Sequence, residues 1–286
     1  MANFETQDGL RLYYTDTADS TQDAKLPLIC LPGLTRCGLD FRYFAPHAQA
    51  YRIITLDARG RGRSAYDNNF MNYNVLQEAQ DVLALMDHLG LKTAAILGTS
   101  RGGLVAMTLA ATAKDRLAAV ILNDVGPEIP SDGLARIMDY LGRKPAAKTL
   151  ELAAQQLHAA MAPAFPDVPS QRWREEVETF YTQTDDGLDL RYDAKMRDAL
   201  LAQAQALGDT VPDLWPMYMA LEGLPLGVLR GANSDILSAE TFQKMRDAIP
   251  SAVAQEIPNR GHVPFLDEPE AVETIHTVLE QTQWQP

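Results

Sequence analysis

The chain has 286 residues, of which 46% are hydrophobic, and a formal net charge of −13 at pH 7. This length is enough for one full core plus an inserted subdomain. The acidic balance argues against nucleic-acid and anionic-membrane partners, and no run approaches the roughly 18 apolar residues of a membrane span. The first residues lack the basic and apolar parts of a secretory signal, and no Cys/His spacing resembles a metal site. We therefore expect a cytoplasmic protein that binds no metal.

The first part of the chain alternates strands with helices. Residues 4–15 alternate in polarity around Asp8-Gly9, which predicts a hairpin. Apolar runs of strand length and helical patterns follow in turn: strands over 27–31, 51–56, 94–98 and 117–122, and helices over 73–89 and 102–113. Runs without polar alternation are typical of strands covered on both faces. The pattern predicts an α/β fold with a mostly parallel central sheet and helices on both faces.

The alternation stops over residues 127–219, where we find helical patterns and no convincing buried strand. Helices are predicted there over 133–141, 146–161, 171–182 and 194–207. The earlier rhythm resumes with strands over 224–231 and 252–257 and helices over 238–248 and 270–281. We therefore predict a core formed by residues 1–126 and 220–286, with residues 127–219 inserted as a helical cap over one edge of the sheet.

A G-x-S-x-G motif lies between the strand over 94–98 and the helix that follows it. Its central residue is Ser100, with Gly98 and Gly102 on either side. A serine that attacks a carbonyl has to project into open space, and a sharp turn from strand to helix provides this. Glycines two residues before and after it leave room for neighbouring backbone. The context predicts a nucleophile, since the motif alone occurs by chance in many proteins.

A serine nucleophile needs a base, and the base needs a carboxylate to orient it. Of the five histidines, only His262 is placed in a loop just after a predicted sheet strand. Asp235 follows the strand over 224–231 and is our preferred carboxylate. Asp124, at the end of the strand over 117–122, is the competitor. Asp57 also ends a strand, but its arginine-rich and glycine-rich surroundings indicate a structural turn.

Stabilising an oxyanion requires two further donors. The backbone N–H of Arg101, directly after the nucleophile, is one candidate. The other is the backbone N–H of Leu34, because Gly33 lets the loop after the strand over 27–31 approach closely.

These motifs and their order resemble the α/β-hydrolase superfamily over nearly the whole chain, and most closely its serine esterase, lactonase and carbon–carbon bond hydrolase branch with a helical cap. The resemblance implies a cofactor-free serine hydrolase that cleaves a carboxylic ester or lactone through an acyl-enzyme. Ser100, His262 and Asp235 would form its triad. The chain departs from the family in having Pro32-Gly33 where His-Gly is common, and in the large charged side chain of Arg101.

The substrate is expected to be a small, partly apolar molecule. Aromatic and methionine residues of the insertion, Trp215 and Tyr218 among them, suggest an apolar pocket, although they could equally fill the insertion's own core. Arg36 or Arg101 could favour a substrate carboxylate, or could pair with one of the many acidic residues.

Other functions use the same residues. Carbon–carbon bond hydrolysis and perhydrolase activity need the same triad, and the chain could instead be a ligand-binding receptor on a hydrolase scaffold. Cofactor-free oxygen or cyanohydrin chemistry would need His262 but not Ser100. The sequence does not separate a monomer from a homo-oligomer.

Overall fold

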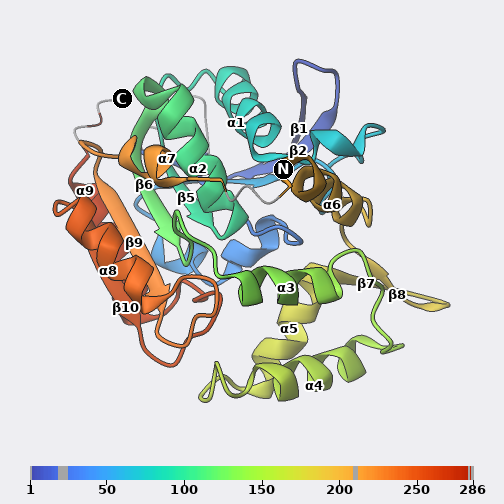
Figure 1. The fold of residues 1–286 in the computed structure, drawn as a ribbon. Coiled ribbons are helices and arrows are strands. Elements are labelled where there is room, and N and C mark those ends of the chain that lie inside the picture. The colour runs from blue at the N-terminus through green and yellow to red at the C-terminus, as the bar shows by residue number, and fades with distance from the viewer. Residues whose placement is uncertain (1, 19–24, 209–211, 283, 285–286) are drawn as a thin grey trace.

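The central feature of the molecule is a mixed sheet. The computed structural model describes residues 2–18, 25–208, 212–282 and 284, and in these ranges eight strands form one sheet in the order β1-β2-β4-β3-β5-β6-β9-β10 (Figure 1). The strands are β1 (Ala2–Glu5), β2 (Arg11–Asp16), β3 (Pro27–Leu31), β4 (Arg52–Asp57), β5 (Ala94–Thr99), β6 (Leu117–Asn123), β9 (Leu226–Gly231) and β10 (Val253–Ile257). The β1–β2 and β2–β4 pairs are antiparallel, and the other neighbouring pairs are parallel. The predicted fold class is confirmed.

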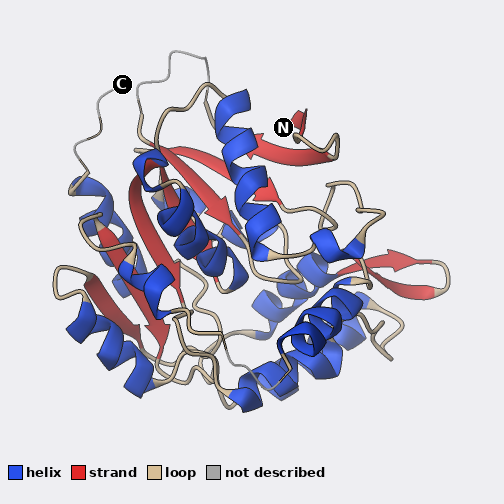
Figure 2. Ribbon diagram, turned by 45° about the horizontal axis from the view of Figure 1, so that its top comes forward, coloured by secondary structure: helices blue, strands red, loops and turns tan. Residues whose placement is uncertain are grey.

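Two apolar layers cover the sheet, because alternate residues of each buried strand point to opposite faces. Ile29 and Ile96 point toward the layer formed by α1, α2, α7 and α8, whereas Leu28 and Leu97 point toward α9. Figure 2 shows these helices against the sheet. The bounds are α1 (Val75–His88), α2 (Arg101–Thr112), α7 (Trp215–Met219), α8 (Ala239–Ala248) and α9 (Pro269–Glu280), with 3-10 turns η1 (Gly38–Arg42), η2 (Ala45–His47), η3 (Phe70–Asn72) and η4 (Lys114–Arg116).

Local chemistry sets several helix ends. The Asn74 side chain accepts a hydrogen bond from the backbone at the start of α1, and Ser238 does the same for α8. Gly90, with φ 68°, ends α1 in the left-handed conformation that glycine adopts most readily. Within the described residues, no helix is long and apolar enough to cross a membrane.

The segment inserted between β6 and β9 contains the four helices predicted for it: α3 (Ser131–Tyr140), α4 (Leu150–Met161), α5 (Ser170–Phe180) and α6 (Met196–Leu207). It also contains a hairpin, β7 (Tyr181–Thr184) and β8 (Gly187–Leu190), which the sequence did not lead us to expect. After β8, the Arg191 carbonyl accepts from the Gly62 N–H at 2.8 Å and connects the insertion to the turn after β4. At the other end of the insertion, α7 packs on α2.

Candidate active site

Ser100 occupies a strained turn between β5 and α2. Its φ of 51° and ψ of −114° are unusual for a residue other than glycine. A Cβ on Gly98 would lie 2.5 Å from the Gly102 backbone, and one on Gly102 would lie 2.1 Å from the Leu31 carbonyl oxygen. The two glycines are therefore needed for the turn to pack against β3.

The structure brings Ser100 and His262 together, although 161 residues separate them along the chain. His262 lies in the loop between β10 and α9, and its Nε2 is 2.9 Å from the Ser100 Oγ. Its Nδ1 is 2.7 Å from Oδ2 of Asp124. A neutral imidazole that donates from Nδ1 to the carboxylate leaves Nε2 free to accept from the serine hydroxyl. The three side chains thus form one continuous hydrogen-bonded chain.

Asp124 is fully buried directly after β6. Besides His262, its carboxylate accepts a hydrogen bond from the Gly231 N–H at 2.8 Å and from the Ser234 hydroxyl at 2.6 Å. Three donors in fixed positions compensate the cost of burying a carboxylate. They also fix the carboxylate in the orientation in which it faces the imidazole.

The structure corrects the prediction that Asp235 orients His262. Asp235 lies four residues beyond the end of β9, and its carboxylate forms an ion pair at 2.7 Å with Arg136 of α3. The Asp235 side chain is 37% exposed, whereas Asp124 is completely buried beside the imidazole. The strand order explains this difference. Because β6 lies next to β5 in the sheet, Asp124, directly after β6, is close to Ser100.

Asn123 is a further residue of the site that sequence reasoning missed. Its backbone carbonyl accepts from the Ser100 N–H at 2.9 Å. Its side-chain Nδ2 donates to the Thr99 hydroxyl at 3.2 Å and to the Pro264 carbonyl at 3.1 Å. Because Pro264 follows His262 by two residues, Asn123 connects the serine turn with the histidine loop. A polar residue at the end of an otherwise apolar strand was the available signal.

The two predicted oxyanion donors lie on segments adjacent to Ser100. In the described part of the chain, neither the Leu34 nor the Arg101 backbone N–H donates to another protein group. Arg101 is the first residue of α2, so its N–H is among those that a helix leaves unpaired. Gly33 lies so near the serine that a Cβ there would be 3.8 Å from the Ser100 Cβ. This arrangement can accept developing negative charge on a carbonyl oxygen attacked by Ser100.

A buried ion cluster supports both of these segments. Glu78 of α1 accepts from Arg61 at 2.7 Å and from the Arg101 Nε at 2.9 Å. Arg61 also donates to the Leu34 carbonyl oxygen at 2.8 Å. Burial alone would raise the pKa of Glu78, but the two guanidinium groups outweigh it and lower that pKa. The Arg101 side chain is therefore engaged in the protein interior, which contradicts its suggested role toward a substrate carboxylate.

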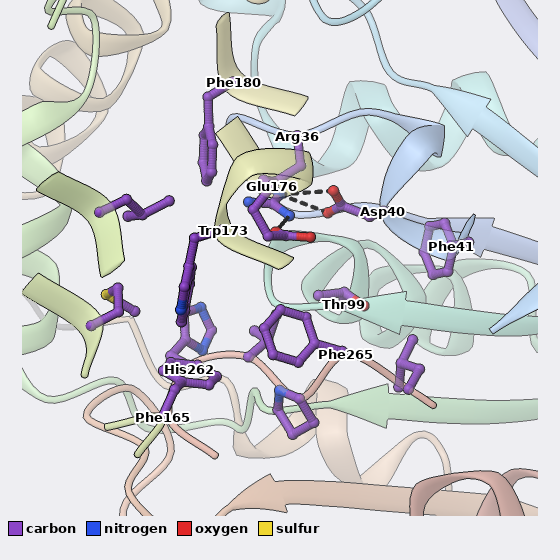
Figure 3. A pocket seen from close by; sticks show the side chains of 15 residues that line it. Arg36, Asp40, Phe41, Thr99, Phe165, Trp173, Glu176, Phe180, His262 and Phe265 are labelled. Atoms are coloured by element: carbon purple, nitrogen blue, oxygen red, sulfur yellow. Dashed lines mark hydrogen bonds and ion pairs between the residues drawn. The ribbon is translucent and has the colours of Figure 1, made fainter. Parts of the chain in front are cut away.

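A cavity of about 90 Å³ opens beside His262 (Figure 3). Its walls come from the loop after β3, the end of β5, the histidine loop and the inserted helices α4 and α5. Most lining residues are apolar: Phe41, Leu157, Met161, Phe165, Trp173, Phe180, Val263, Pro264, Phe265 and Leu266. Figure 3 shows His262 toward one end and Arg36 toward the other. A small, mainly apolar group fits such a space.

Arg36 lines the cavity, as the sequence suggested, but it is already matched by acidic groups. Its Nε donates to both oxygens of Asp40 at 2.8 Å, and its Nη2 pairs with Glu176 of α5. Burial raises the pKa of Asp40 to about 6, in spite of the opposing effect of Arg36. With both carboxylates ionised, this cluster carries a net negative charge, which opposes an anionic substrate.

Two other substrate-binding candidates lie elsewhere. Tyr218 is fully buried on the α2 side of the sheet, and its hydroxyl donates to the Met245 carbonyl at 2.9 Å. Trp215 donates to Glu128 at 2.9 Å. Neither lines the cavity beside His262, so their binding of substrate stays a prediction that this geometry does not favour. Both belong to α7, which packs with the core helices. In the described ranges, no group of three or more His, Cys, Asp or Glu side chains could hold a metal.

Comparison with known proteins identifies the family of the chain. The model of the alpha/beta hydrolase family matches residues 28–275. The chain belongs to the α/β-hydrolase family. Its matched region extends from β3 into α9 and includes the serine turn, the inserted segment and the histidine loop.

Relatives within this family act on different substrates. The chain is 35% identical to a 3-hydroxybutyrate-oligomer hydrolase from Cupriavidus necator, over 85% of this chain and 84% of that protein. A putative 2-succinyl-6-hydroxy-2,4-cyclohexadiene-1-carboxylate synthase from Bacillus subtilis is 23% identical over 93% of each chain. The crystal structure of an alpha/beta hydrolase from Novosphingobium aromaticivorans superimposes with a TM-score of 0.87 at 37% identity, and the match covers 98% of this chain and 97% of that one.

Proposed function

We propose that the protein is a serine hydrolase that cleaves carboxylic esters of small, partly apolar acids. The observation that carries this proposal is the hydrogen-bonded chain from the Ser100 hydroxyl through His262 to Asp124, with distances of 2.9 and 2.7 Å. These distances suit transfer of a proton from the serine to the imidazole and stabilisation of the resulting imidazolium. No cofactor is needed for this chemistry.

The proposed reaction has two halves. The Ser100 Oγ bonds to the ester carbonyl carbon while His262 Nε2 takes the hydroxyl proton, and the carbonyl oxygen becomes an oxyanion held by the Leu34 and Arg101 N–H groups. The carbon–oxygen bond to the alcohol then breaks, and the imidazolium returns the proton to the departing oxygen. In the second half, water gives a proton to His262 while its oxygen bonds to the acyl carbon. The bond from that carbon to Ser100 Oγ then breaks, His262 returns the proton to Oγ, and the acid leaves.

The cavity and the relatives narrow the choice of substrate. A space of about 90 Å³ with mainly apolar walls favours short acyl groups. The 35% identity to a 3-hydroxybutyrate-oligomer hydrolase over most of both chains supports an ester as the substrate and makes short hydroxyacid esters the first compounds to test. The synthase relative is more distant, at 23% identity.

A comparison of chain lengths tests the proposal. Initial rates on 4-nitrophenyl acetate, butyrate, octanoate and laurate should be highest for the two short esters, by at least about tenfold in kcat/KM. The Ser100→Ala variant should lose about 10³-fold or more, because the nucleophile is removed. Retention of ester turnover by this variant would reject the proposed mechanism. Mass spectrometry of a quenched wild-type reaction should detect Ser100 carrying the acyl group.

A further inference from the structure

One wall of the cavity carries an unusual buried donor. Trp173 of α5 is 3% exposed and lines the cavity, yet no protein group in the described residues accepts a hydrogen bond from its indole N–H. Buried N–H groups are nearly always hydrogen-bonded, since an unpaired one costs free energy. Trp215, by contrast, has its N–H paired with Glu128 at 2.9 Å. The Trp173 indole N–H is therefore an unpaired donor in the wall of the cavity.

The packing around Trp173 holds the ring in place. The indole stacks on His158 with ring centres 6.2 Å apart, and Phe165 and Phe265 meet it edge to face at 5.4 and 6.0 Å. A ring fixed on several sides does not turn freely toward a new partner. Any acceptor for its N–H consequently has to be brought by the occupant of the cavity.

An acceptor lies one helical turn from Trp173 on the same helix. Glu176 follows Trp173 by three residues, a spacing that places the two side chains on one face of α5. Glu176 is 4% exposed and lines the same cavity. Its Oε2 pairs with Arg36, whereas its Oε1 has no hydrogen-bond partner among the described residues. Figure 3 shows Trp173 and Glu176 on the cavity wall between Phe180 and His262.

We propose that Trp173 and Glu176 form a binding position for a hydroxyl group on the acyl chain of the substrate. This inference rests on the proposed ester hydrolysis and specifies its substrate class as esters of hydroxy acids. A hydroxyl both accepts and donates, so it can take the indole N–H and give its own hydrogen to Glu176. An ammonium group has no lone pair for the indole, and a carboxylate would be repelled by Glu176 and Asp40. The hydroxyl is the small group that satisfies both side chains.

Three matched esters test the inference on the wild-type protein: ethyl 3-hydroxybutyrate as separate enantiomers, ethyl butyrate, and ethyl 3-methoxybutyrate. One enantiomer of the hydroxy ester should exceed ethyl butyrate by about tenfold in kcat/KM, the effect of one or two well-formed hydrogen bonds. The methoxy ester keeps the acceptor but lacks the donor, so it should also fall below the hydroxy ester. Equal kcat/KM for hydroxy and plain esters would overturn the inference.

Variants at Trp173 and Glu176 test whether these two side chains cause the preference for the hydroxy ester. Trp173→Phe should lower kcat/KM for the hydroxy ester about tenfold more than it lowers kcat/KM for ethyl butyrate. Trp215→Phe, which removes an indole outside the cavity, should leave the preference unchanged. In Glu176→Gln the amide oxygen is expected to turn toward Arg36 and its NH2 toward the cavity, so the hydroxy-over-methoxy preference should shrink or reverse.

The results separate failure of this inference from failure of the proposed function. Equal loss on the hydroxy and plain esters in Trp173→Phe would show a merely structural role for the indole and would overturn the inference. Ester hydrolysis that depends on Ser100 would still stand in that case. Turnover of all three esters by Ser100→Ala would instead reject the function itself.

Discussion

Replacing Asp124 by asparagine tests which carboxylate orients His262. The Asp124 carboxylate accepts from three donors: the Gly231 N–H, the Ser234 hydroxyl and His262. An asparagine oxygen can keep the bond to Gly231. The Ser234 hydroxyl, which already accepts from the Ile236 and Leu237 N–H groups, would lose its acceptor, at a cost of about 1–3 kcal/mol that the fold should tolerate. The main change is at His262, whose Nδ1 would face an amide N–H donor in place of a carboxylate oxygen.

The new amide N–H favours the wrong tautomer of His262. In that tautomer Nδ1 accepts a hydrogen bond from the amide, and Nε2 carries the proton. Nε2 could then no longer take the proton of Ser100. Losing the orienting carboxylate in a Ser-His-Asp triad lowers kcat by about 10⁴-fold, which corresponds to about 5.5 kcal/mol in the activation free energy. We expect kcat/KM for 4-nitrophenyl butyrate to fall by about 10³- to 10⁴-fold in Asp124→Asn.

Asp235→Asn is the matched control. It breaks an ion pair with Arg136 in which the two side chains are 37% and 58% exposed. Such pairs contribute at most about 1 kcal/mol to stability, and this one does not touch the imidazole. Activity should stay within about twofold of wild type, and circular dichroism should show both variants folded. A large loss in Asp235→Asn together with a small one in Asp124→Asn would refute the reasoning.

Three further predictions follow from buried groups near the site. Glu78→Gln should lower the free energy of unfolding by about 3–5 kcal/mol in urea titrations, because it leaves two buried guanidinium groups poorly matched. It should also lower kcat, since the cluster supports both oxyanion segments. Because burial raises the pKa of Asp40 to about 6, acidification below that pH removes its charge from the cavity. The kcat/KM ratio of a sulfonate-bearing ester to its neutral analogue should therefore rise several-fold between about pH 7 and pH 5, and Asp40→Asn should abolish this change. Gly102→Ala should cost about 3 kcal/mol or more, or prevent folding, because its Cβ would lie 2.1 Å from the Leu31 carbonyl oxygen.

Each of these predictions has a control on the chain. Asp87→Asn removes a more exposed ion pair with Arg116 and should change the free energy of unfolding by less than about 1 kcal/mol. In the pH experiment, any effect of pH that the two esters share cancels in the ratio. Gly223→Ala places a Cβ in open space at a φ of +84°, so only backbone strain of about 1–2 kcal/mol should result. Equal effects of Gly102→Ala and Gly223→Ala would contradict the packing argument.

The sheet was predictable because its central strands are buried on both faces. Strands β3, β4 and β5 are rich in apolar residues, and each of their residues is buried. The β7–β8 hairpin was missed because Tyr181–Thr184 is mostly exposed and shows no alternation. A turn of this kind is determined by its contacts with the rest of the chain and leaves no periodic pattern in the sequence.

The serine turn was recognisable because it follows the buried strand β5 and contains the glycines that it requires. The histidine loop was recognisable because His262 lies beside Gly261, just after the predicted strand that became β10. The choice between Asp124 and Asp235 as the orienting carboxylate depended on the order of the strands in the sheet and on the course of the loop after β9. Neither can be predicted from a short sequence motif. The role proposed for Trp173 and Glu176 of α5 was not predicted for a similar reason. Their position at the cavity depends on the packing around the helix, which the sequence of the helix does not show.

The position of Asp124 has a consequence for protein engineering. Under the proposed mechanism the orienting carboxylate is Asp124, directly after β6, so the turn that carries Asp235 has no chemical role. Saturation libraries can vary position 235 with little loss of turnover, provided that Ser234 is kept beside Asp124. Position 124 itself would show almost no tolerated replacements in the same screen.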